Sequence, residues 1–268
     1  MIELFEQDVR TNDRQSSKGN QLKWENDGMW YKADYTGYEG LTEYVISHLF
    51  VKTTLATNEY VLYDLEQIKY DDRIYNVVRI SCFIEDEWQI ITLERLFKIT
   101  LGKSLYKMIY SISDIEERLI YLVEQVERLT GLVEFGNYMN KLFTIDAFFL
   151  NEDRHTHNIA VLMNGNGKFK YCPIFDNAAG LLSDTTMDYP LCKNVYDLMK
   201  KAKSKTICSD FDEQLDVSEK LYGNNIKMAF THKDVSEIIQ NANNYSDLEK
   251  DRVENIIFEQ MRKYKYLF

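Results

Sequence analysis

The sequence predicts an α+β protein in two parts: a small β-rich part with one helix, and a larger, mainly helical part that carries a β-hairpin. Short runs of β-branched and aromatic residues dominate the first part, which favours strands. Beyond it, apolar residues recur at helical spacing, which favours helices. The polar segment 84–87 separates the two patterns, so we expect one lobe at residues 1–86 and the other at 87–268.

The composition is that of a folded protein, because 268 residues allow two lobes with a substantial core and 45% of them are hydrophobic. The net charge of −11 argues against a broad nucleic-acid-binding surface, so we expect no nucleic-acid partner. No apolar run approaches the roughly 20 residues that span a bilayer, and residues 1–8 lack the pattern of a signal peptide. We therefore expect a cytoplasmic protein without a membrane partner, and non-classical export to a host stays open.

In the first part, the sequence Asp27-Gly28 predicts a hairpin turn between two short strands within residues 23–34. A helical pattern follows at 39–52. Two further β-rich segments, separated by an acidic turn, lie at 60–65 and 74–83.

In the second part, the polar segment 151–158 is framed by a helix and a hairpin. The pair Ser113 and Glu116 is a capping box that opens a strong helix. The other expected elements are helices at 91–101, 136–150 and 247–266, and strands at 159–163 and 169–175.

Three polar residues of this second part suit phosphoryl transfer. Asp153 and Asn158 are five residues apart on the polar segment, and the hairpin brings Asp176 back toward them. An Asp can accept the proton of a substrate hydroxyl, whereas an Asn carbonyl and a second Asp offer the oxygen ligands that Mg²⁺ prefers. We therefore expect Asp153 to act as a base and Asn158 and Asp176 to bind Mg²⁺.

Two residues of the first part complete this set. Lys32 lies among aromatic residues on the second strand and could supply a positive charge to ATP phosphates. Glu43, on the first turn of the following helix, could hold that amine in place. The alternative for Glu43 is a surface residue stabilised by the helix N-terminus.

A small polar stretch precedes the strand that carries Lys32, at the position where nucleotide kinases keep their phosphate-binding loop. It does not contain the P-loop pattern, so an ordinary hairpin loop is the alternative. Its residues are Ser16, Ser17, Lys18, Gly19 and Asn20.

Two further residues of the polar segment admit more than one role. Arg154 pairs with a carboxylate of the site or a loop phosphate, or else forms a structural salt bridge. His155 and His157 are spaced like a chelate but have no third ligand, so we expect His155 to orient the segment by hydrogen bonds.

These residues resemble the motifs of the HipA-like kinases. Residues 151–158 match the catalytic segment N-x-D-R-H-x-x-N of that family, and residues 173–176, Pro-Ile-Phe-Asp, match its metal-binding segment. Lys32, Glu43 and the stretch 16–20 resemble its nucleotide lysine, paired glutamate and phosphate loop. In length and layout the chain is most similar to the smaller, secreted CtkA-like type.

The resemblance implies a two-lobed, protein-kinase-like fold and a Ser/Thr protein kinase that transfers the γ-phosphate of ATP, with Mg²⁺, to a protein hydroxyl. It assigns catalysis to Asp153, Asn158 and Asp176. It assigns nucleotide contacts to Lys32, Glu43, His155 and residues 16–20, with autophosphorylation at Ser16 or Ser17.

The same residues also allow functions other than a Ser/Thr protein kinase. A nucleotide-binding pseudokinase or interaction module would keep the fold without turnover, and a kinase-fold enzyme could act on a small molecule or a lipid. The chain is shorter than HipA and has no room for its extra N-terminal subdomain. The toxin–antitoxin pairing of HipA, with an antitoxin-like partner, therefore has no support in this sequence.

Overall fold

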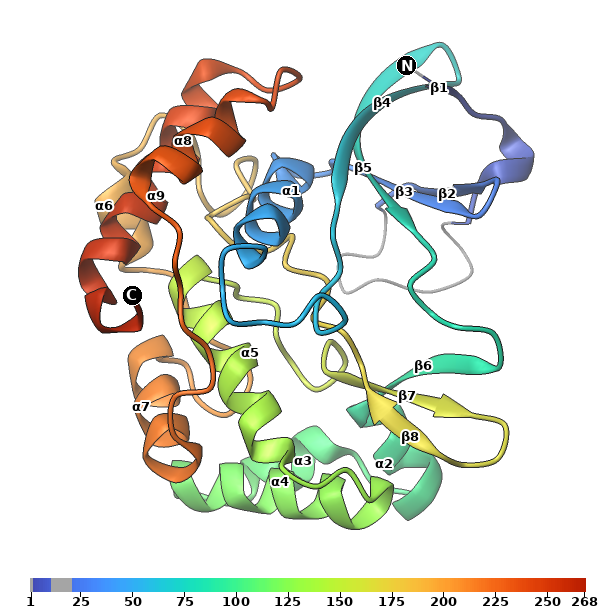
Figure 1. The fold of residues 1–268 in the computed structure, drawn as a ribbon, viewed down its shortest axis with the longest axis vertical. Helices are drawn as coiled ribbons and strands as arrows, with labels where there is room; N and C mark the ends of the chain where they lie inside the picture. The colour runs from blue at the N-terminus through green and yellow to red at the C-terminus, as the bar shows by residue number, and fades with distance from the viewer. Residues whose placement is uncertain (1, 11–20) are drawn as a thin grey trace. The chain divides into compact units, whose positions relative to one another are not determined.

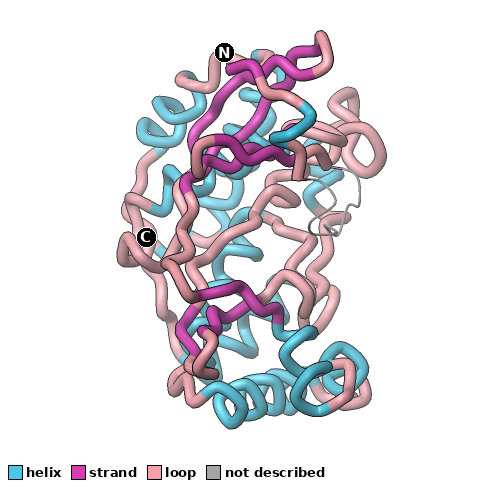
Figure 2. Tube along the Cα trace, turned by 90° about the vertical axis from the view of Figure 1, so that its right-hand side faces the viewer, coloured by secondary structure: helices cyan, strands magenta, loops and turns pink. Residues whose placement is uncertain are grey.

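The strands form two sheets, one in each of two units of the chain (Figure 2). A computed structural model describes residues 2–10 and 21–268. Unit 1 comprises residues 1–83, 175–202 and 228–268, and unit 2 comprises residues 84–174 and 203–227. The first break, at residues 83 and 84, is next to the lobe boundary expected at residue 86. Residues 175–202 and 228–268, later in the chain, also belong to unit 1. The expected limits of the two lobes, 1–86 and 87–268, stay a prediction.

Unit 1 contains a five-stranded sheet in the order β1-β4-β5-β3-β2, in which only β1 runs parallel to its neighbour. Helix α1 packs on this sheet and also contacts α8, which in turn packs against α9 (Figure 1). The elements of the unit are β1 (Ile2–Glu3), the 3₁₀ helix η1 (Glu6–Asp8), β2 (Lys23–Asn26), β3 (Met29–Ala33), α1 (Glu39–Phe50), β4 (Asp64–Tyr70), β5 (Arg73–Ser81), α6 (Val195–Met199), α8 (His232–Gln240), α9 (Asp247–Lys263) and η2 (Lys265–Leu267).

The alternation of β3 places Lys32 on a desolvated face of this sheet. Tyr31 and Ala33 point into one apolar cluster, so Trp30 and Lys32 point to the opposite face. There Trp30 packs on a second cluster, which includes Val78. Val78 is also the cross-strand partner of Lys32, and this register puts the lysine stem against apolar neighbours.

The expected β2–β3 hairpin is present, with Asp27 and Gly28 at positive φ angles of 49° and 74° in its turn. The strand expected at 60–65 is wrong in position, because β4 runs from Asp64 to Tyr70. Val61 and Tyr63 are instead buried in the second apolar cluster without pairing as a strand. Their hydrophobic pattern reflects packing on the sheet face.

Unit 2 contains a three-stranded antiparallel sheet in the order β6-β7-β8, together with five helices of the described chain (Figure 1). The elements are β6 (Trp88–Thr92), α2 (Leu93–Leu101), α3 (Leu105–Tyr110), α4 (Ile115–Thr130), α5 (Phe135–Phe149), β7 (Ala160–Asn164), β8 (Phe169–Tyr171) and α7 (Phe211–Tyr222). The sequence pattern does not predict β6. The helix expected at 91–101 begins too early, because residues 91 and 92 pair with β7 as the end of β6.

Helix α5 is the buried core of unit 2 and delivers the polar segment that follows it. Almost every residue from Met139 to Phe149 is buried. Leu150 then adopts a left-handed conformation, with φ of 56°, and ends the helix. For α4 the expected cap is corrected: Asp114, one residue beyond Ser113, accepts the backbone N–H of Glu117 at 2.8 Å.

No helix in the described part of the chain is long and apolar enough to cross a membrane. None of the four cysteines, all of which lie in the described part of the chain, forms a disulfide bond.

A carboxyl group ties the end of β3 to helix α1 and to the connection between α8 and α9. Asp34 accepts the Gly40 N–H at 2.6 Å with Oδ1 and the Tyr245 hydroxyl at 2.9 Å with Oδ2. A Cβ at Gly40 would lie only 2.7 Å from the Tyr245 oxygen, so the close approach requires glycine. Burial raises the pKa of Asp34 to about 8, although the Gly40 N–H opposes the shift.

This raised pKa predicts a pH-dependent stability. Between pH 3.8 and about 8 the unfolded chain has lost the Asp34 proton while the folded chain keeps it. The free energy of unfolding should therefore fall with rising pH, by up to about 1.4 kcal/mol per pH unit. Asp34→Asn removes this contribution, so denaturant unfolding from pH 5 to 9 should show the wild type losing stability relative to the variant. Asp72→Asn, at a side chain that is 97% exposed, should follow the wild type. Parallel curves for all three proteins would contradict the expectation.

Candidate active site

The polar segment after α5 folds around the carboxylate of Asp153. The Asn158 Nδ2 donates to Asp153 Oδ2 at 3.0 Å and to its backbone oxygen at 2.8 Å. His155 Nε2 lies 3.4 Å from Asp153 Oδ1. The backbone N–H of Asp153 donates to Asn151 Oδ1 at 3.3 Å. Asp153, His155 and Asn158 therefore form one local cluster, and the expected orienting role of His155 stays a prediction.

Beneath this cluster lies a buried ion pair. Arg154 Nε is 3.2 Å from both carboxylate oxygens of Asp146, and the two side chains are 2% and 0% exposed. Asn151 Nδ2 also donates to Asp146, at 3.0 Å. Of the roles left open for Arg154, the structural salt bridge is the one that the geometry supports.

Sequence reasoning missed Asp146. The available signal was a single acidic residue inside an otherwise apolar run of α5. Burial raises the pKa of Asp146 to about 6, and the charge and hydrogen bonds of Arg154 oppose that rise. Such a carboxylate is tolerated because a cation is buried with it.

Asp146→Ala should destabilise the protein by about 3–5 kcal/mol, because it leaves the Arg154 charge buried without its partner. Denaturant unfolding monitored by circular dichroism measures this loss. Glu116→Ala is the matched control, since it removes a carboxylate of unit 2 from the more exposed pair with Lys220. That change should cost less than about 1 kcal/mol. Equal losses in the two variants would contradict a structural role for the buried pair.

A second cluster, in unit 1, is built around the amine of Lys32. Its Nζ lies 3.3 Å from Glu43 Oε1 and 2.8 Å from Asp176 Oδ1. The two carboxylates differ in exposure, since the side chain of Glu43 is 1% exposed and that of Asp176 is 32% exposed. Glu43 is thus an internal partner of the lysine rather than a surface residue at a helix N-terminus.

Backbone groups hold both carboxylates in place. The N–H of Asn177 donates to Glu43 Oε2 at 3.0 Å. The N–H of Asp176 donates to the Tyr63 hydroxyl at 3.4 Å, and Asp176 has a left-handed φ of 59°. Burial lowers the pKa of Lys32, but the charges of Asp176 and Glu43 outweigh it and hold that pKa well above its ordinary value. The lysine therefore carries a permanent positive charge.

The predicted site residues thus fall into two groups. Lys32, Glu43 and Asp176 meet in unit 1, and Asp153, His155 and Asn158 meet in unit 2. The predicted phosphate loop, residues 16–20, lies outside the described residues.

Asn158 and Asp176 each carry a type of ligand that suits the expected magnesium ion. Within the described residues, the hydrogen bonds of Asn158 use its Nδ2 and backbone atoms and leave Oδ1 without a donor. An amide oxygen and a partly exposed carboxylate are hard ligands, which Mg²⁺ combines with water and nucleotide phosphates. No group of three or more His, Cys, Asp or Glu side chains suited to a metal occurs in the described chain.

No family model matches the chain, and no curated protein matches it. Solved structures do match. The crystal structure of the Helicobacter pylori proinflammatory kinase CtkA has a TM-score of 0.65 and 17% identity, over 98% of this chain and 94% of that one. HipA of Shewanella oneidensis MR-1, solved with HipB and its operator DNA, has a TM-score of 0.47 and 11% identity, over 97% of this chain and 62% of that one.

The likeness to CtkA shows that this chain has a kinase fold of α+β class. It confirms, at the level of the fold, the resemblance that the sequence motifs predicted. At 17% identity it does not by itself define an activity.

Proposed function

We propose that this protein is an ATP- and Mg²⁺-dependent Ser/Thr protein kinase of the HipA-like type. The observation that carries the proposal is the Lys32 amine held between Glu43 and Asp176, residues 11 and 144 positions away along the chain. These three were expected from the sequence to be the phosphate-binding lysine, its paired glutamate and a magnesium ligand. A lysine with a fixed partner and a more exposed second carboxylate suits the binding of metal-bound phosphates.

In the proposed reaction Asp153 positions the acceptor. Its carboxylate accepts the proton of the substrate hydroxyl as that oxygen forms a bond to the γ-phosphorus. The bond from the γ-phosphorus to the β–γ bridging oxygen breaks, and ADP leaves with that oxygen. Lys32 holds the phosphates by charge, while Asn158 and His155 keep the Asp153 carboxylate in place. Mg²⁺, when bound to Asn158 and Asp176, would neutralise phosphate charge.

The acceptor is proposed to be a protein hydroxyl, and a cytoplasmic location is part of the same proposal. The HipA structure contains HipB and operator DNA. At a TM-score of 0.47, that likeness carries neither partner over to this chain.

Transfer of labelled γ-phosphate from ATP with Mg²⁺, to the protein itself and to a generic protein substrate, tests the proposal. Asp153→Asn should lower kcat by about 10²–10⁴-fold by removing the base. Asp176→Asn should also abolish transfer. Asp216→Asn, at an exposed position on α7, should transfer at the wild-type rate.

A wild-type rate in Asp153→Asn would refute the assigned base. Absence of transfer by the wild type, with ATP still raising the melting temperature, would instead favour a nucleotide-binding pseudokinase. Absence of both would remove the kinase proposal.

Autophosphorylation is proposed at Ser16 or Ser17 by resemblance to the HipA-like kinases. Incubation with ATP and Mg²⁺ should add phosphate to one of these serines, detected by peptide mass spectrometry. The double variant Ser16→Ala/Ser17→Ala should not acquire that mass. A wild-type protein that labels other substrates but carries no phosphate on either serine would disprove this assignment.

A further inference from the structure

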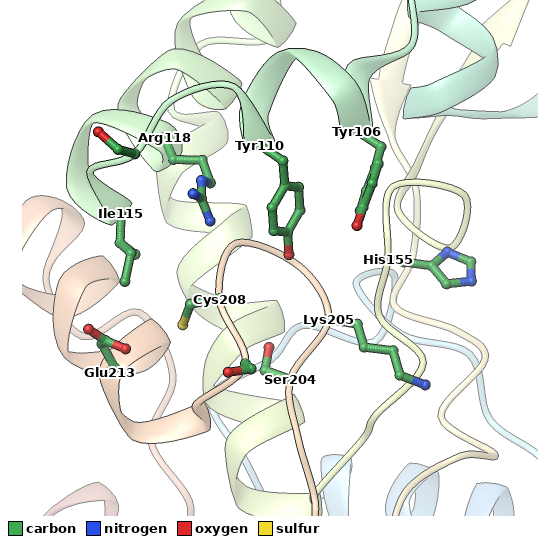
Figure 3. A pocket seen from close by; sticks show the side chains of 11 residues that line it. Tyr106, Tyr110, Ile115, Arg118, His155, Ser204, Lys205, Cys208 and Glu213 are labelled. Atoms are coloured by element: carbon green, nitrogen blue, oxygen red, sulfur yellow. The ribbon is translucent and has the colours of Figure 1, made fainter.

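A cavity of about 620 Å³ opens beside the catalytic segment, within unit 2 (Figure 3). Its size falls within the range of about 300–1,000 Å³ that is usual for ligand sites. In the view of Figure 3, His155 and Lys205 lie at one end and Arg118 and Glu213 toward the other. Tyr106 and Tyr110, both from α3, lie along one side. Of the residues that line it, the phosphoryl-transfer chemistry above uses His155 alone.

The aromatic wall of the cavity is held by Arg118. The guanidinium carbon of this residue lies 4.5 Å from the centre of the Tyr110 ring. The same guanidinium donates to the carbonyl oxygens of Ile112 and Ile207, which joins the α3–α4 connection to the segment 203–210. The rings of Tyr106 and Tyr110 are 4.5 Å apart, with exposed fractions of 47% and 36%. A fixed and exposed aromatic pair of this kind is a ready contact surface.

Both walls are also tied to the catalytic segment. Glu94 Oε2 accepts the Thr156 hydroxyl and the Tyr106 N–H, each at 3.0 Å. On the other wall, the Thr206 hydroxyl donates to the backbone oxygen of Arg154. The N–H of Lys203 donates to Glu152 Oε1 at 2.8 Å. These bonds on either side of Lys205 fix its position relative to Asp153.

The charge at the end nearest Asp153 is positive. Lys205 is exposed, and among residues 2–10 and 21–268 it forms no ion pair with a carboxylate. Burial lowers the pKa of His155 against the opposing charge of Asp153, and the charges of His157 and Lys205 add to the lowering. His155 in turn lies 3.4 Å from the Asp153 carboxylate. A group bound at this end therefore lies beside the proposed base and next to an uncompensated cation.

We propose that the cavity is the acceptor-binding site, and that it takes a peptide with an acidic side chain close to the Ser or Thr to be phosphorylated. The inference rests on the proposed function, because it gives that function a substrate class. A hydroxyl that reaches Asp153 brings its neighbouring residues past His155. A carboxylate among those neighbours pairs with Lys205, and the peptide packs on the rings of Tyr106 and Tyr110.

A series of Ser peptides tests this, with Glu, Gln or Lys placed in turn at each of the three positions on either side of the serine. The wild type should prefer Glu over Gln at one or more positions, with about tenfold higher kcat/KM, equivalent to about 1.4 kcal/mol. Lys205→Glu should lose that preference and favour Lys there. Lys168→Glu is the matched control, since it makes the same charge change at an exposed lysine of unit 2 that does not line the cavity. Its preference should remain that of the wild type.

Binding of the same peptides with Ala in place of Ser, measured by fluorescence anisotropy, gives a readout that does not need turnover. Binding that favours the Glu peptides and is lost in Lys205→Glu would support the site even without phosphate transfer. Absence of transfer together with such binding would overturn only the proposed kinase activity. Phosphate transfer without any Glu preference, or with a preference that Lys205→Glu retains, would overturn the site and leave the kinase proposal standing. Neither transfer nor Glu-selective binding would overturn both.

Discussion

The buried contact between Arg154 and Asp146 is the constraint on which the arrangement of unit 2 depends. Two charges with almost no exposure are stable only because each compensates the other and hydrogen bonds satisfy their remaining atoms. The pair connects the interior of α5 to the polar segment that follows it. Because the backbone oxygen of Arg154 also accepts the Thr206 hydroxyl, the same anchor fixes the segment that carries Lys205. The same buried residue, Arg154, therefore helps to fix both the position of Asp153 and the wall of the cavity that carries Lys205.

The cluster around Lys32 depends on the same compensation of buried charge, but here one cation faces two carboxylates. Burial alone would favour the neutral amine, and the carboxylates prevent that. Glu43 is enclosed and also bound by the Asn177 N–H, so it holds the lysine in one place. Asp176, which is 32% exposed, keeps contact with solvent. A rigid partner and an accessible partner around one amine suit the proposed phosphate-binding role of Lys32.

Local sequence patterns were reliable where one short-range effect dominates. The Asp27-Gly28 turn, α1 and α5 followed from turn chemistry and from apolar periodicity. The errors arose where packing between distant residues decides. The run that contains Val61 and Tyr63 has a strand-like composition but is buried against the sheet face. Strand β6 exists because it pairs with β7, some 70 residues further along the chain, and so it left no clear local signal.

The sequence by itself determined the α+β class, the order of the charged residues along the chain and the motifs that resemble the HipA-like kinases. These are properties of residue type and short spacing. Only the tertiary structure decided that Lys32 has two carboxylate partners, that Arg154 is bound to Asp146, and that a cavity with Lys205 at one end opens beside His155. These contacts depend either on residues far apart along the chain, such as Lys32 and Asp176, or on how the segment after α5 folds back, as for Arg154 and Asp146. Their electrostatic character comes from the burial that folding imposes, because charge interactions strengthen as water is excluded.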